Sequence, residues 1–297
     1  MNTKKTGLVL EGGGMRGAYT AGVLDVFKNR NIDFPYIIAV SAGANNGSDF
    51  VAGQSERNKK VLVDYVTDDR YMGFKNLLKS GNFFGMDFLF DELPNRIEPF
   101  DYESFRKAES TFKVGVTECQ TGNTVYFEHN EFDPHFFMGK VLRASSSLPI
   151  VAKPVEIEGK LYLDGGITDP IPLSKSIEDG NYYNVLVLTR DKNYRKSSSV
   201  GKNILAKLFL HKYPQIVKAM KKRHLVYNNT LKKIEKLEFK KRVFVFRPQE
   251  ELNIDRFEND QSMLNSIYER GYEETLSRLD DFKHWLREIN YVNRNTG

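Results

Sequence analysis

Cysteine is almost absent from this sequence, since Cys119 is the single cysteine in 297 residues. A lone cysteine cannot form a disulfide within the chain. Disulfides accumulate in proteins of oxidising compartments and are rare in those of reducing ones. The sequence therefore predicts a protein of the reducing cytoplasm.

Long apolar runs are also missing. The first apolar stretch, residues 7–10, ends at Glu11, and no stretch approaches the ~20 apolar residues that span a bilayer. That stretch is also too short for the core of a secretory signal peptide. With 28% charged residues the chain is too polar for an integral membrane protein, so we expect a cytoplasmic location, with peripheral membrane attachment left open.

Histidine is scarce, and none of the five histidines lies in a recognisable catalytic setting. A serine nucleophile needs a base to take its proton, and histidine is the usual one. We interpret the five as surface or packing residues: His129, His135, His211, His224 and His284. The histidines therefore do not point to a base for a serine nucleophile.

Acidic residues are scarce in one stretch. Between residues 191 and 242, sixteen Lys and Arg residues accompany three acids, a local net charge of +13 in a chain whose total is +5. Such a concentration suggests a surface that meets an anionic membrane, a nucleic acid or an acidic ligand. A solvated, lysine-rich helical face explains it equally well.

The apolar pattern predicts an α/β layered fold. Residues 7–11, 36–40 and 184–189 are short apolar runs without alternation, typical of parallel strands covered on both faces. Helical patterns alternate with these strands, while 111–118 and 124–128 flank a hairpin turn.

We expect a single domain over residues 1–297. A charged, serine-rich stretch at 192–201 is the best linker candidate, but residues 243–247 have the character of a core strand of the same sheet. The expected parts are a core over 6–190, a basic helical insertion over 191–242, and a C-terminal strand with helices over 243–297.

A glycine-rich segment follows the first expected strand and reads Gly12-Gly13-Gly14-Met15-Arg16-Gly17. It satisfies the dinucleotide-binding pattern G-x-G-x-x-G, but the accompanying acid should end the second strand, whereas Asp33 precedes it. Glycine N–H groups at a helix N-terminus can hold a phosphate or the oxyanion of a tetrahedral intermediate. Arg16 is placed to brace this loop or to contact an acidic group.

Ser41 follows the second expected strand, within Ala39-Val40-Ser41-Ala42-Gly43. In the nucleophile elbow G-x-S-x-G, a serine lies on a sharp strand-to-helix turn between small residues. Ala39 replaces the first glycine and adds one methyl group, whereas Gly43 keeps the second. Ser41 is therefore a candidate nucleophile, although an ordinary strand end can carry the same pattern.

Asp164 ends a short apolar strand and is followed by Gly165 and Gly166, which alone is only a turn signal. In their order along the chain, the glycine-rich loop, the serine segment and this aspartate resemble the patatin-like phospholipase family. Residues 143–149 are similar to a further segment of that family, and residues 243–248 with the following helix resemble its bacterial members.

The resemblance covers about residues 6–190 and implies a fold, a patatin-like three-layer α/β sandwich whose central, mostly parallel sheet is flanked by helices. It also implies an activity, the hydrolysis of ester bonds of lipids such as phospholipids or lysophospholipids. Neither a metal nor an organic cofactor is implied.

The resemblance further implies a Ser–Asp dyad, in which Ser41 attacks the ester carbonyl and Asp164 accepts its proton. The N–H groups of Gly13 and Gly14 would hold the oxyanion, with Gly12 and Gly17 shaping the turn. Aspartate is a weak base at its ordinary pKa, so we expect Asp164 to be partly buried and within hydrogen-bond reach of Ser41.

Three alternatives remain open. The same chemistry could act on a soluble ester or thioester, or the dyad could be vestigial in a non-catalytic lipid-binding protein. A nucleotide-binding protein using the glycine loop is the third, and the position of Asp33 opposes it.

Apolar residues recur at helical spacing within the basic stretch. One set is Ile204, Leu205, Leu208 and Phe209, and a second, after Pro214, is Val217, Met220, Tyr227, Leu231 and Ile234. Basic amphipathic helices over 201–241 could lie on an anionic membrane, or pack on the core with their lysines in solvent. Nucleic-acid binding is not expected, because this basic region has few aromatics for stacking on bases and contains no recognised module.

Overall fold

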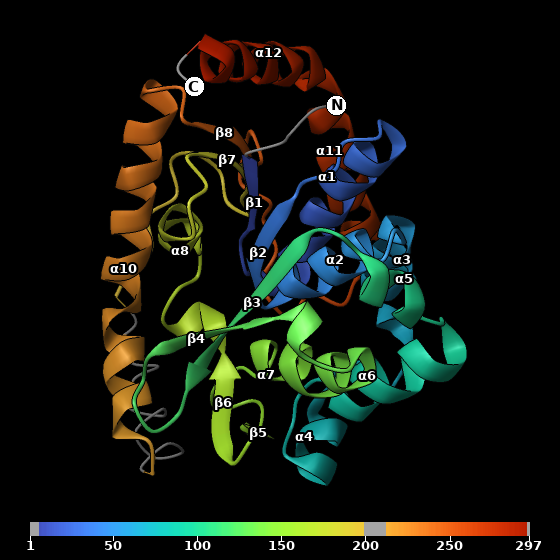
Figure 1. Cartoon of the computed structure of the whole chain (residues 1–297). Coiled ribbons are helices and arrows are strands. Elements are labelled where there is room, and N and C mark those ends of the chain that lie inside the picture. The colour runs from blue at the N-terminus through green and yellow to red at the C-terminus, as the bar shows by residue number, and fades with distance from the viewer. Residues whose placement is uncertain (1–5, 199–211, 296–297) are drawn as a thin grey trace.

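The computed structural model describes residues 6–198 and 212–295 (Figure 1). Within them, eight strands form one sheet in the order β5-β6-β3-β2-β1-β7-β8, with β4 paired to β3. The strands are β1 (Thr6–Leu10), β2 (Tyr36–Val40), β3 (Thr111–Glu118), β4 (Thr124–Glu128), β5 (Val155–Ile157), β6 (Lys160–Asp164), β7 (Tyr183–Val187) and β8 (Val243–Phe246).

The helices surround this sheet. They are α1 (Gly17–Asn29), α2 (Ala42–Val51), α3 (Ser55–Lys59), α4 (Phe74–Ser80), α5 (Tyr102–Lys107), α6 (Pro134–Phe136), α7 (Arg143–Ser145), α8 (Leu173–Glu178), α10 (Pro214–Phe239), α11 (Gln261–Ser277) and α12 (Leu279–Asn295). Short 3₁₀ or π-helical elements are η1 (Gly14–Arg16), η2 (Lys60–Asp64), η3 (Tyr65–Thr67), η4 (Phe88–Ile97), η5 (His129–Glu131), η6 (Phe137–Leu142) and η7 (Gly165–Ile167).

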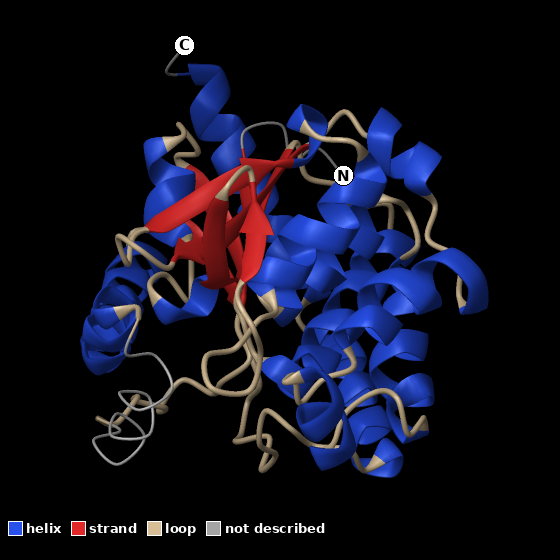
Figure 2. Cartoon of the chain, turned by 90° about the horizontal axis from the view of Figure 1, so that it is seen from below, coloured by secondary structure: helices blue, strands red, loops and turns tan. Residues whose placement is uncertain are grey.

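The two faces of the sheet pack on different helices, because successive side chains of a strand point to opposite faces. Leu8 and Leu10 of β1 join the core formed with α1, α2, α11 and α12. Val9 of the same strand joins a second core, formed with α8 and α10. Figure 2 shows helices on both sides of the sheet, so the predicted three-layer α/β sandwich is confirmed.

β3 changes partners along one edge, and this exchange sets the positions of two candidate residues. Its first half pairs in parallel with β2, so that Gly115 lies opposite Val40. Its last residues pair antiparallel with β6, so that Val116 lies opposite Asp164. The end of β2, just before Ser41, and the end of β6 therefore lie against adjacent residues of β3.

α10 packs its apolar stripe on the sheet. Val217, Tyr227, Leu231 and Ile234 are buried, whereas Met220 is half-buried. The structure therefore favours core packing for this stripe; the other stripe, within 201–211, lies outside the described residues. In the described ranges, no helix combines the length and the apolar character needed to cross a membrane.

Residues 192–198, part of the linker candidate, lie against α10. The backbone N–H of Lys196 donates to Asn228 Oδ1 (2.9 Å), and Asn228 Nδ2 donates to Lys196 O (3.0 Å). Asn228 belongs to α10, so this segment has a fixed place beside that helix.

Candidate active site

Ser41 lies at the turn between β2 and α2 with an unusual backbone conformation, φ 55° and ψ −131°. A non-glycine residue in this region carries strain that the surrounding structure must hold, as a nucleophile elbow requires. Gly43 allows α2 to start close to β1, because a Cβ there would lie 2.6 Å from Glu11 O. Ala39 is fully buried in the sheet, so its extra methyl group is accommodated there.

Ser145 holds this turn in place. The Ser41 N–H donates to Ser145 Oγ (2.8 Å), which in turn donates to Gly115 O on β3 (2.8 Å). Two residues later, Ser147 O accepts the Asp164 N–H (2.9 Å). Residues 143–149, singled out by family resemblance alone, thus connect the serine turn to the aspartate turn.

Asp164 is the last residue of β6 and is buried, with an exposed fraction of 1%. Its Oδ1 accepts the Gly166 N–H (2.7 Å), whereas Oδ2 has no hydrogen-bond partner in the described part of the chain. Gly165 is required here, because a Cβ would lie 2.2 Å from Gly115 O. The burial is more complete than the partial burial expected from the sequence.

Burial raises the pKa of Asp164 above its ordinary value, and the Ser41 hydroxyl and the Arg223 guanidinium lower it to a smaller extent. Ser41 is thus close enough to stabilise the carboxylate of Asp164. The two side chains nevertheless do not form a hydrogen bond of normal geometry, because Asp164 Oδ2 has no partner among the described residues. Catalytic hydrogen bonds are often long before substrate binds. A carboxylate in this state is a stronger base than an exposed one.

The glycine-rich loop lies next to Ser41. A Cβ on Gly12 would lie 3.0 Å from Ser41 Cβ, and Gly14 has φ 59° with no room for a side chain beside Arg256 O. The Gly12 N–H donates to Pro170 O (3.3 Å), but the Gly13 and Gly14 N–H groups have no acceptor among the described residues. Two amides of this loop are therefore available to a ligand.

The end of the loop is fixed by its neighbours. Arg16 is buried, and its Nη1 donates to Ile254 O (3.2 Å), so it braces the loop as one sequence interpretation suggested. Gly17 begins α1, and a Cβ there would lie 3.0 Å from Ala42 Cβ. Asp33 precedes β2 and so lies at the opposite end of that strand from Ser41, away from the glycine loop.

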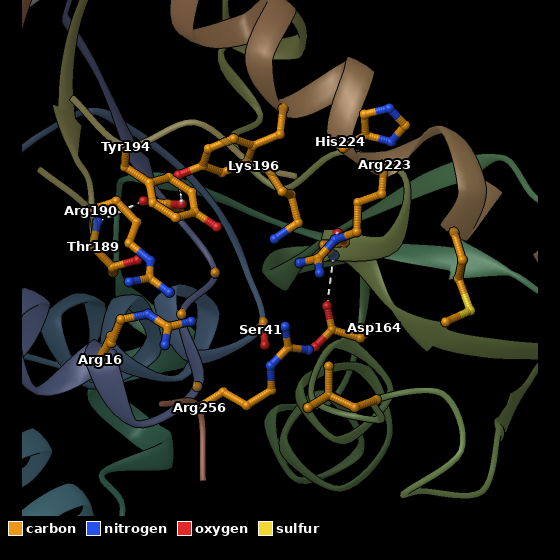
Figure 3. Close-up of a pocket in the computed structure, with 18 of the residues that line it drawn as sticks. Arg16, Ser41, Asp164, Thr189, Arg190, Tyr194, Lys196, Arg223, His224 and Arg256 are labelled. Atoms are coloured by element: carbon orange, nitrogen blue, oxygen red, sulfur yellow. Dashed lines mark hydrogen bonds between the residues drawn. The ribbon is translucent and has the colours of Figure 1, made fainter. Parts of the chain in front are cut away.

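Ser41, Asp164 and the glycine loop line one cavity of about 270 Å³ (Figure 3). Ser41 also lines a smaller cavity of about 60 Å³ whose walls are mostly apolar, including Met15, Leu62, Tyr71, Phe84, Met86 and Phe90. A third cavity, of about 200 Å³, reaches Asp164 and is lined by Pro149, Ile150, Ile167 and Phe257. The candidate site is therefore polar on one side of Ser41 and apolar on the other.

Several residues of the larger cavity were not singled out from the sequence. Lys196, Arg223, His224 and Arg256 all line it, so one histidine does lie at the site. Arg223 and His224 belong to the stretch interpreted only as a basic helix, and no motif surrounds Arg256. Their approach to Ser41 depends on tertiary packing, which local patterns do not reveal.

The protein is an α/β sandwich in which a serine in a strained turn and a buried aspartate line one cavity. The family model described as patatin-like phospholipase matches residues 8–175, more than half of the chain, and the chain belongs to this family. A second model, for a domain of unknown function (DUF6363), matches residues 213–287.

Curated relatives are similar in sequence to part of this chain. YjjU of Escherichia coli K12 is 30% identical over 190 residues, covering 61% of this chain and 51% of that protein. Lysophospholipase NTE1 of Meyerozyma guilliermondii is 27% identical over 195 residues, covering 63% of this chain and 13% of that protein. The match thus spans about half the length of YjjU.

Among solved structures, VipD of Legionella pneumophila has a similar fold. The TM-score is 0.53 at 15% identity, and the match covers 93% of this chain and 67% of that one. At this identity the likeness concerns the fold alone.

Proposed function

We propose that this protein is a serine acyl hydrolase that cleaves ester bonds of lipids through a Ser41–Asp164 dyad. The observation that carries the proposal is the shared cavity, in which the strained Ser41 lies beside a buried carboxylate with one unpartnered oxygen. Membership of the patatin-like phospholipase family and a relative named lysophospholipase support a lipid ester as substrate.

The chemistry uses groups already in the cavity. Ser41 Oγ attacks the ester carbonyl carbon while its proton passes to Asp164 Oδ2, and the Gly13 and Gly14 N–H groups stabilise the oxyanion. The tetrahedral intermediate collapses, and the leaving alcohol takes the proton from Asp164. Water then attacks the acyl-enzyme with Asp164 again as base, which releases the fatty acid and restores Ser41.

The apolar cavity beside Ser41 suits the acyl chain. Its walls come from α2, η2 and η4 and from the segment after α7, and they would remove part of a hydrocarbon chain from water at about 25 cal/mol per Å². The headgroup then occupies the larger polar cavity. This division favours a lipid over a small soluble ester.

The direct test is hydrolysis of p-nitrophenyl butyrate and of lysophospholipids by the wild type, Ser41→Ala and Asp164→Ala. We expect both variants to lose turnover by several orders of magnitude while keeping native circular dichroism. Ser277→Ala, at an exposed serine outside the cavity, is the matched control and should retain full activity.

Labelling by a fluorescent organophosphonate gives a second readout, because the reagent reacts only with an activated serine. Labelling of the wild type and Ser277→Ala, but not of Ser41→Ala, is expected. An active Ser41→Ala would refute the dyad. A folded wild type that neither turns over nor labels would instead indicate a non-catalytic lipid-binding protein.

The same proposal includes peripheral contact with anionic membranes. Lys218, Lys221 and Lys222 are exposed on α10, and each basic residue near an anionic bilayer contributes about 1 kcal/mol of attraction. Because the apolar stripe of α10 is buried, this contact would be electrostatic and lost at high salt. Equal cosedimentation with neutral and anionic vesicles, unchanged by replacing all three lysines with glutamine, would exclude it.

A further inference from the structure

Five basic side chains from four separate segments converge on the cavity that contains Ser41. These residues, the cationic cluster, are Arg16, Arg190, Lys196, Arg223 and Arg256. Figure 3 shows their head groups directed toward the space beside Ser41 and Asp164. Arg16 follows β1, whereas Arg190 and Lys196 both follow β7. Arg223 belongs to α10, and Arg256 precedes α11.

The cluster is poorly neutralised by the protein. Only Arg190 has a carboxylate within 4 Å in the described ranges, Glu251 at 3.4 Å. The cavity's own acids are Glu11 and Asp164, and both Glu11 oxygens already accept hydrogen bonds, from Tyr227 Oη (2.7 Å) and the Thr189 N–H (2.6 Å). An excess of positive charge therefore remains next to Ser41.

Few of the N–H donors of the cationic cluster form hydrogen bonds within the described part of the protein. Arg16 Nε is buried without a partner, and Arg223 donates through Nε to Gly166 O. The Arg256 side chain makes no hydrogen bond to any residue in the described part of the chain. Guanidinium groups with free N–H donors form bidentate hydrogen bonds to phosphate and carboxylate oxygens.

Holding these charges together is costly in free energy. Burial and the neighbouring Arg223 and Arg256 lower the pKa of Lys196 to about 7, and burial and Arg190 lower the pKa of Arg16 to about 10. A buried charge without a partner destabilises a fold unless a ligand compensates it. An anion in the cavity would restore both pKa values and remove this cost.

We infer that the cationic cluster binds the phosphate monoester headgroup of the substrate, so that the protein acts on phosphatidic or lysophosphatidic acid. This inference rests on the proposed hydrolase function. A phosphate monoester carries about −1.5 to −2 charges at pH 7 and three acceptor oxygens, which suits several unpaired cations. A choline headgroup would place a quaternary ammonium among four guanidinium groups and is disfavoured.

The two cavities then hold the two ends of one lipid. The phosphate lies among the basic residues, the part of the acyl chain next to the ester enters the apolar cavity, and the ester bond lies at Ser41, which lines both cavities.

The test compares lysophosphatidic acid with lysophosphatidylcholine of the same acyl chain, below their critical micelle concentrations. Wild type should cleave lysophosphatidic acid with the higher kcat/KM. Lys196→Gln and Arg256→Gln should each lower that value about 10- to 100-fold, as expected for a lost charged hydrogen bond. Arg256→Lys should restore part of it. The loss of turnover on uncharged p-nitrophenyl butyrate should be smaller than the loss on lysophosphatidic acid.

Lys107→Gln removes an equal charge from the exposed face of α5 and is the matched control, expected to behave as wild type. Preference for lysophosphatidylcholine, or equal losses on both charged and uncharged esters in the variants, would overturn the inference. If no ester is cleaved at all, the hydrolase proposal fails, and binding must be measured directly.

Calorimetric titration of Ser41→Ala provides that measurement independently of turnover. Non-hydrolysable ether-linked lysophosphatidic acid should bind, and Lys196→Gln in the same background should weaken it at least tenfold. Absence of binding would refute the subsite. Inorganic phosphate distinguishes the two sources of the anion: binding as tight as that of the ether lipid would show that free phosphate, rather than a lipid headgroup, is the ligand.

Discussion

Ser145 connects the backbone of Ser41 to β3 through two hydrogen bonds. It is fully buried, and its hydroxyl is both the acceptor of the strained residue's N–H and a donor to Gly115 O. The positive φ of Ser41 is costly by itself, of the order of 1–3 kcal/mol, and persists only if such contacts hold it. The position of the candidate nucleophile therefore depends on a second serine that does not react.

Ser145→Ala should leave the Ser41 N–H buried without an acceptor, which costs about 1–3 kcal/mol of unfolding free energy. We expect kcat for p-nitrophenyl butyrate to fall by more than KM changes, because the loss misplaces Oγ rather than removing a substrate contact. Urea denaturation and steady-state kinetics measure both effects. Ser147→Ala, whose hydroxyl bonds only to Arg143 O one turn earlier, should leave kcat near the wild-type value.

Asp164 makes stability and activity depend on pH in opposite directions. Because burial raises its pKa in the folded protein, its contribution to stability is complete below the unfolded pKa of about 3.9 and is lost as the pH rises through the folded pKa. In the proposed dyad, activity needs the ionised base and should therefore rise through that same folded pKa.

Asp164→Asn should therefore melt at a higher temperature than wild type at pH 7, although it is inactive. The difference should shrink as the pH falls below the raised pKa of Asp164 in the folded protein, where the wild-type carboxyl is neutral. Differential scanning calorimetry at several pH values measures it. Equal melting temperatures at pH 7 would show that the carboxylate is not strained by its burial.

At the scale of elements, α10 meets the sheet through a buried polar contact as well as its apolar stripe. Tyr227 Oη donates to Glu11 Oε1 (2.7 Å), at the end of β1 and directly before the glycine loop. The helix that supplies Arg223 is thereby held against the strand that leads to the loop.

Tyr227→Phe should remove the donor to a buried carboxylate oxygen and lower the unfolding free energy by about 1–3 kcal/mol. Tyr182→Phe is the control, since Tyr182 is 55% exposed, and should be within about 0.5 kcal/mol of wild type. Chemical denaturation followed by circular dichroism compares them. Identical midpoints for the two variants would argue against a stabilising role for this contact.

The strands and the three motifs could be predicted from the sequence because each is local. Ser41 follows one short apolar strand and Asp164 ends another, and the glycines predict the close backbone approaches that the structure contains. The cationic cluster could not be predicted, since its members span residues 16 to 256 and meet only after the sheet has formed. The burial of Val217 and Tyr227 could not be predicted either, because the same amphipathic stripe can face a core or a membrane.

At the scale of the whole molecule, the sheet joins the two regions matched by separate family models. β7 lies after the first match and pairs in parallel with β8, which lies within the second. Ser41 belongs to the first region and Arg256 to the second, yet both line one cavity. We propose that residues 1–297 fold as one domain.

Trp285 is the only tryptophan and packs against Phe244 of β8 and Phe282, so its fluorescence reports on the C-terminal region. Activity reports on the region around Ser41. On heating, both signals should be lost in one coincident transition, as for a cooperative single domain. Two separated transitions would contradict the proposal and show that the C-terminal region unfolds by itself.

The residues that line the candidate cavity come from two different parts of the sequence. Ser41, Asp164 and the glycine loop lie before residue 165, whereas four of the five basic residues lie between 190 and 256. Under the proposed function, substitutions in the later stretch should therefore alter which headgroup is accepted while leaving Ser41 and Asp164 in place. Relatives could then differ in substrate preference while sharing the same reaction mechanism.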